Sequence, residues 1–229
     1  MKYGLFVGVC TALLVLGCQK RLDRPDGVFR SDEGEYVLTI VLDLSGSFNA
    51  LMAEDGKAWA FVCQVIEQYF QDRLGHSDKL ILAQLSANDR ALLWRGTPLE
   101  LRQDFSSASA FREWLMSKAD PYGSLVYEGI VKATEYTLAD PILADGKGKA
   151  ALFILSDMCD TAGEVMQSRD RAVKAIADLV RHDGVVGIYY VDVGLCPIWQ
   201  QLLHDAGVPA TRSHVEAEIV GRPLLPSFE

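Results

Sequence analysis

A run of aliphatic and β-branched residues that ends abruptly in polar residues constrains this chain more than any other feature. Residues 37–42 read Val-Leu-Thr-Ile-Val-Leu, and Asp43, Ser45 and Ser47 follow directly. Because hydrophobic and polar residues do not alternate in this run, it predicts a strand buried on both faces, in the middle of a parallel sheet covered by helices on both sides. The polar residues would then lie just beyond the carboxyl end of the strand, where ligands bind in open α/β sheets.

The chemistry of this polar segment indicates a cation site. Asp43, Ser45 and Ser47 place one carboxylate and two hydroxyls within five residues. These are hard oxygen ligands of the kind that Mg²⁺ or Ca²⁺ prefers. The alternative is a strand-to-helix turn in which the serines cap the next helix. The motif is short, so its position after a buried strand carries the interpretation.

Length and charge narrow the class of protein. The chain has 229 residues, of which 49% are hydrophobic, and this suits one α/β domain with a sizeable core. The net charge is −9, and Lys and Arg form no basic patch in the sequence. We therefore expect no nucleic-acid partner.

The N-terminal residues are expected to lie outside the folded domain. Lys2 precedes an apolar segment, 5–16, that is too short to span a bilayer as a stable helix, and Cys18 follows. This arrangement resembles the lipobox of bacterial lipoproteins. The resemblance implies that residues 1–17 are a signal peptide, that Cys18 carries the lipid, and that residues 18–35 form a flexible tether. The alternatives are an ordinary signal peptide or a short anchor that happens to contain a cysteine.

The residue after Cys18 bears on localisation. It is Gln19, whereas Asp at this place usually signals retention in the inner membrane of Gram-negative bacteria. We therefore expect a lipid-anchored protein of the cell envelope, in the outer rather than the inner membrane if the source is Gram-negative.

The predicted elements alternate between strands and helices along residues 36–215. Strands are expected at 36–43, 80–85, 91–94, 150–155, 185–191 and 210–215, and the longer helices at about 59–70, 125–138 and 165–182. This alternation predicts a doubly wound, mostly parallel sheet. A four-residue turn, 87–90, joins the second strand to the third, so the third should be an antiparallel edge strand. Residues 97–105 are ambiguous, 52–56 are a less certain helical start, and 216–229 form a tail without a clear element.

Three polar stations follow buried elements of this pattern. They are Asp43-x-Ser45-x-Ser47, then Gly123-Ser124 at the start of a helix, and finally Ser156-Asp157 after the strand at 150–155. Together with the edge hairpin, the set resembles the von Willebrand factor type A (VWA) domain and its metal-ion-dependent adhesion site. The resemblance covers roughly residues 35–215, and it implies a six-stranded sheet with strand order 3-2-1-4-5-6. The sequence departs from the family at Ser124, where Thr is usual, and at Met158, where Gly is usual.

The resemblance also implies a ligand set and a function. Ser45 and Ser47 would bind Mg²⁺ directly, with Mn²⁺ or Ca²⁺ as alternatives, and Ser124 would bind directly or through water. Asp43 and Asp157 would act mainly through waters, and Asp43 would lie in a solvated crevice. An Asp or Glu of a protein partner would fill the open coordination position, so the chain would be a binding module and not an enzyme. Phe48 and Tyr122 are expected to flank the mouth of the site.

Two other functions stay open. A metal-dependent hydrolase could use the same sheet, but no residue order suggests a base beside the serines, and the four histidines lack metal-ligand spacing. A scaffold of the same fold could instead bind partners without metal.

Export would permit a disulfide. Cys159 and Cys196 follow neighbouring strands, so a bridge between them is geometrically allowed. Cys63 lies on a predicted helical core stripe, and we expect a buried thiol there.

Overall fold

The computed structural model describes residues 35–71, 77–85, 90–119, 123–144, 146, 148–162, 166–219 and 225, and within 68–71 it describes the backbone only. The predicted signal peptide, Cys18 and all of the predicted tether except Glu35 lie outside these residues. Within the described part of the chain, no helix is long and apolar enough to cross a bilayer.

The strands form a single mixed sheet. In chain order they are β1 Tyr36–Asp43, β2 Lys79–Leu85, β3 Leu92–Gly96, β4 Lys149–Leu155, β5 Val185–Tyr189 and β6 Ser213–Glu216. Their order in the six-stranded sheet is β3-β2-β1-β4-β5-β6. Every neighbouring pair is parallel except β2 and β3, which pair antiparallel at the edge. The predicted strand order and the edge hairpin are therefore confirmed.

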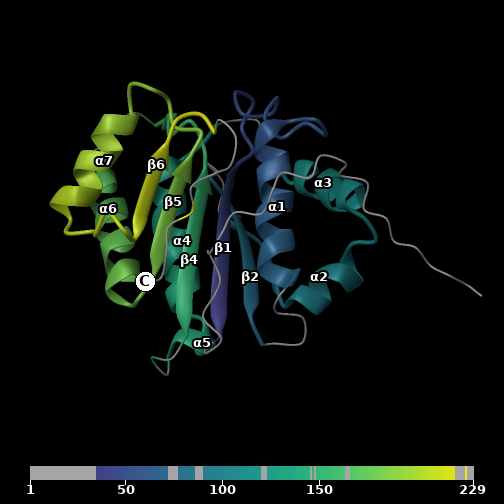
Figure 1. The fold of residues 1–229 in the computed structure, drawn as a ribbon. Coiled ribbons are helices and arrows are strands. Elements are labelled where there is room, and N and C mark those ends of the chain that lie inside the picture. Colours follow the sequence, from purple (N-terminus) through teal and green to yellow (C-terminus); the bar gives the residue numbers. More distant parts are fainter. Residues whose placement is uncertain are drawn as a thin grey trace, which may run out of the picture.

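Helices cover both faces of this sheet (Figure 1). Three helices, α1 Lys57–Gln71, α2 Pro98–Asp104 and α3 Ala108–Met116, pack on one face. Another three, α4 Val126–Leu138, α6 Met166–Arg181 and α7 Cys196–Asp205, pack on the other. A short helix, α5 Pro141–Ala144, precedes β4. The fold is the α/β arrangement that the sequence predicts.

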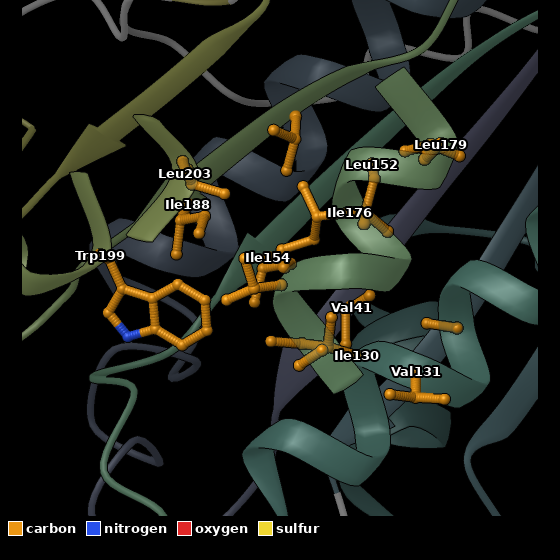
Figure 2. Close-up of a cluster of buried hydrophobic side chains, with 14 of the residues drawn as sticks. Val41, Ile130, Val131, Leu152, Ile154, Ile176, Leu179, Ile188, Trp199 and Leu203 are labelled. Carbon is orange, nitrogen blue, oxygen red and sulfur yellow. The ribbon is translucent and has the colours of Figure 1, made fainter. Parts of the chain in front are cut away.

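The central strand separates two hydrophobic cores. All eight residues of β1 are buried. Leu38, Ile40 and Leu42 face the helices of the first face, while Val41 faces the second. Figure 2 shows the second core, in which Val41 and Ile154 of the sheet meet side chains of α4, α6 and α7. The lack of alternation in the sequence of β1 thus reflects burial on both sides.

Local signals explain the helices that the sequence left uncertain. Thr97 and Glu100 form a reciprocal capping box that starts α2, and Ser107 caps α3 through the backbone N–H of Ala110. Residues 52–56 form turns, so α1 begins only at Lys57. On α7, Trp199 is buried, whereas the preceding residue Ile198 is 40% exposed.

The cysteine predictions are corrected in part. β4 and β5 are neighbours, as expected, but Cys159 and Cys196 are free cysteines, so no bridge joins them. The reason is their orientation: Cys159 is exposed, whereas Cys196 begins α7 and packs against the second core. Cys63 is only partly buried and packs against the edge of the first core.

Candidate functional site

The three polar stations meet at the carboxyl ends of β1 and β4. These strands pair in parallel up to Leu42 and Leu155. Beyond them the chain leaves β1 for α1 on one face of the sheet and leaves β4 for α6 on the other face (Figure 1). A crevice opens where connections diverge in this way, and ligands of α/β sheets bind there. The topology therefore brings residues far apart in the sequence to one place.

Asp43 forms the buried end of the site. Its side chain is fully buried, and its Oδ1 accepts hydrogen bonds from the backbone N–H of Ser45 at 2.9 Å and from Ser124 Oγ at 3.0 Å. Its Oδ2 accepts a third hydrogen bond from Ser156 Oγ at 2.8 Å. The expectation that this carboxylate lies in a solvated crevice is wrong, because the ends of the other two loops close over it.

The outer half of the site opens to solvent. Ser45 Oγ and Ser47 Oγ lie 3.2 Å apart, and Ser47 Oγ donates to Asp157 Oδ2 at 3.3 Å. The other carboxylate oxygen of Asp157 accepts from the backbone N–H of Cys159 at 2.9 Å. Ser47 is exposed and Asp157 half-buried, so a solute can reach their oxygens. All five predicted site residues are thus brought together.

The sequence placed Ser156 in the third station but assigned it no role in the site. Its hydroxyl is buried, donates to Asp43, and accepts from the backbone N–H of Met158 at 2.9 Å. Its position between the end of β4 and Asp157 was the available signal. Ser156 joins the third station to the first and acts as a positioning residue.

Met158 takes the backbone conformation that glycine favours. Its φ is +63°, in the left-handed region, and its side chain is 1% exposed. The loop after Asp157 therefore turns sharply even though Gly is absent, and burial of the Met158 side chain in the second core offsets the strain.

The residues at the mouth differ from those expected. Phe48 is 1% exposed and packs edge-to-face on Tyr190, with ring centroids 6.0 Å apart, so its predicted place at the mouth is wrong. Tyr122 lies outside the described residues. Val193 is instead 78% exposed, on a turn whose preceding residue Asp192 donates its backbone N–H to the Asp157 carbonyl at 2.9 Å.

The mouth of the site carries a negative field. Partial desolvation of the Cys159 thiol raises its pKa, and the nearby carboxylates of Asp157 and Asp192 raise it further. Such a field attracts cations. Within the described ranges, no group of three or more His, Cys, Asp and Glu residues is placed to hold a metal ion, so a cation here depends on the serine hydroxyls.

The oxygen spacing suits a small cation. Adjacent oxygens around an octahedral Mg²⁺ lie about 2.8–3.0 Å apart, given Mg–O distances of about 2.0–2.1 Å. The distances between the oxygens of Ser45 and Ser47 and between those of Ser47 and Asp157 are 3.2 and 3.3 Å. The residues present therefore fit such an ion, and Ser45, Ser47 and Asp157 could hold it.

Comparisons with known proteins add evidence on the fold. No family model matches the chain, and no curated protein matches it. A solved structure with a similar fold is the pilus adhesin SpaC from Lactobacillus rhamnosus GG in its open conformation. It is 12% identical with a TM-score of 0.54, and the match covers 84% of this chain and 29% of the adhesin chain. This chain thus spans less than a third of that adhesin, and at such low identity the likeness shows the fold alone.

Proposed function

We propose that this protein is a lipid-anchored binding module of the cell envelope, with a VWA-like domain that holds a protein partner through a divalent metal. One observation carries the proposal. Side chains from three separate loops, Asp43, Ser45, Ser47, Ser124 and Asp157, converge in one hydrogen-bonded group at the switch point of the sheet.

The site residues divide into those that would contact the cation and those that support them. Ser45 and Ser47 offer neutral hydroxyls to the cation, and Asp157 offers one carboxylate oxygen or a water held by it. Asp43 and Ser124 lie behind them and fix the loops. A bound Mg²⁺ would supply an electrophilic open position, and neutral hydroxyl ligands keep that position attractive to a carboxylate of the partner.

The surroundings of the site support a protein as the partner. Val193 is 78% exposed and directly follows Asp192, whose backbone N–H donates to the Asp157 carbonyl. An aliphatic side chain next to a charged centre provides apolar contact around a carboxylate–metal bond, as interfaces usually combine the two. The adhesin fold similar to this one is consistent with such a role, but only as a fold-level analogy.

The anchoring part of the proposal rests on the sequence. Cys18 ends a short apolar segment and begins a polar tether, which would hold the domain away from the lipid surface. If the source is Gram-negative, Gln19 favours the outer membrane over the inner one.

A metal-dependent hydrolase has less support than a metal-dependent binding module. His204 and His214, whose side-chain contacts the structure describes, pair with Asp205 and Glu216 rather than with Ser45 or Ser47. A serine nucleophile needs a positioned base, and neither His204 nor His214 supplies one to these serines. The metal-independent scaffold remains the second candidate, because the hydrogen bonds of the site also hold the loops without an ion.

A crosslinking pull-down separates these functions. We expect the purified protein to capture a protein from envelope extract in Mg²⁺, to lose it in chelator, and to regain it when Mg²⁺ or Mn²⁺ is added back. Ser47→Ala should fail to capture it, whereas Ser106→Ala, an exposed serine of the loop before α3, should behave as wild type. Capture that is indifferent to chelator would favour the scaffold, and turnover of generic esters or phosphoesters would favour the hydrolase.

A further inference from the structure

The loop after β4 contacts the second station as well as the first. Thr161, at the far end of this loop, donates two hydrogen bonds to the carbonyl oxygen of Ser124, from its backbone N–H at 3.0 Å and from its Oγ1 at 2.9 Å. The peptide group that follows Ser124 is therefore fixed by a residue that is no ligand itself.

The same threonine packs against the residue before Ser124. Gly123 has a φ of +124°, and a Cβ built on it would lie 2.7 Å from both Oγ1 and Cγ2 of Thr161. No other residue fits there without moving Thr161, since both the backbone angle and the space require glycine. Thr161 therefore contacts the backbone on both sides of Ser124, at Gly123 before it and at the Ser124 carbonyl group.

The neighbouring residue Asp160 secures the helix that begins after Ser124. The residue at the start of α4, Leu125, makes no side-chain cap hydrogen bond. Asp160 supplies a cap from the other loop, because its Oδ2 accepts from the backbone N–H of Tyr127 at 3.3 Å. Its Oδ1 accepts from the backbone N–H of Ala162 at 2.8 Å, which fixes the carboxylate. A carboxylate at a helix N-terminus is also favoured by the helix dipole.

From these contacts we infer that Thr161 and Asp160 are positioning residues that hold Ser124 in place for the cation site. This inference rests on the proposed function. The contacts of Thr161 and Asp160 with residues 123–127 form a clamp between the second and third loops, and this clamp controls the affinity of the site for the cation. The Ser124 hydroxyl donates to Asp43, so a shift of the Ser124 backbone would disturb the buried end of the site as well.

The test uses Thr161→Val in the purified full-length protein, because valine keeps the shape and the backbone N–H but removes the hydroxyl. We expect Mg²⁺ affinity, measured by calorimetry, to fall about three- to tenfold, the effect of losing one supporting hydrogen bond near a metal. Thr161→Ser should recover the affinity. Thr211→Val, at an exposed turn near β6, is the matched control and should bind as wild type. Thermal unfolding should be nearly unchanged, since Thr161 is exposed.

A second readout separates this inference from the proposed function. Hydrogen exchange in the segment 123–127 should be faster in Thr161→Val and Asp160→Ala than in wild type, with or without metal. If wild type binds Mg²⁺ and Thr161→Val binds it equally well, the clamp is refuted and the metal site stands. If wild type binds no Mg²⁺, the metal site fails, and the clamp is then supported by faster exchange or refuted by unchanged exchange.

Discussion

Ser156 Oγ lies 2.8 Å from Asp43 Oδ2 and joins the ends of β1 and β4 across the switch point of the sheet. Both side chains are fully buried. The innermost layer of the site is therefore a structural hydrogen-bond network, while the more exposed residues of the site, Ser47 and Asp157, lie farther out. This division decides how substitutions in the site should behave.

Asp43→Ala should destabilise the fold strongly. It removes a buried acceptor of three hydrogen bonds and leaves the donors of Ser45, Ser124 and Ser156 unsatisfied. We expect a loss of about 2–5 kcal/mol in the free energy of unfolding, measured with urea. Asp157→Asn, at a half-buried position, should cost less than about 1 kcal/mol. Equal losses in the two variants would show that Asp43 is not structural.

Substitutions at Met158 test its left-handed backbone. Met158→Ala and Met158→Gly both remove the buried side chain, but glycine also relieves the strain of φ +63°. Met158→Gly should therefore be more stable than Met158→Ala by about 1 kcal/mol, the reverse of the usual order in helices and strands. Denaturant unfolding measures the difference, and a less stable glycine variant would contradict the assigned conformation.

The buried tyrosines predict a loss of stability in alkali. Burial raises the pKa of Tyr189 and Tyr190, and the carboxylate of Glu216 raises both further. A raised folded-state pKa gives stability that is present below the unfolded value of about 10 and is lost as the pH rises through the folded value. Urea unfolding at pH 8 to 11 should show this decline.

Tyr190→Phe provides the matched variant for that experiment. It keeps the aromatic contacts with Phe48 and Phe61 but cannot ionise. Its stability should fall less steeply with pH than that of wild type. Identical slopes would mean that Tyr190 ionises as freely in the folded state as in the unfolded state.

The parts of this fold that follow from local pattern were predictable from the sequence. The unbroken apolar run of β1 required burial on both faces, and the short turn after β2 required an antiparallel neighbour. The convergence of Asp43 and Asp157 followed because neighbouring parallel strands end at one edge of the sheet, whereas Ser124 was expected there only from the family resemblance.

The parts that depend on how loops close in three dimensions were not predictable. Phe48 follows the first station in the sequence, but it packs on Tyr190 beyond β5 and so leaves the mouth. Asp43 is buried because Ser124 and Ser156 arrive from distant segments to cover it. The orientation of Cys159 and Cys196 likewise depends on the start of α7 and not on the spacing of the strands.

Cys18→Ala tests the anchor. If Cys18 carries the lipid, the variant should move from detergent-soluble membrane fractions to soluble fractions, or should accumulate as uncleaved precursor. Metabolic labelling with a radioactive fatty acid gives the direct readout. A lipid label of unchanged intensity on the variant would contradict lipid attachment at this residue.

Isothermal titration calorimetry with Mg²⁺ measures directly whether the site binds a metal ion. Ser47 is the residue to change, because it is exposed and its loss leaves the hydrogen bonds of Asp43 intact. We expect saturable Mg²⁺ binding by wild type and by Ser106→Ala, and an affinity at least about tenfold lower in Ser47→Ala. Equal affinity in wild type and Ser47→Ala, or no binding by wild type, would contradict this expectation.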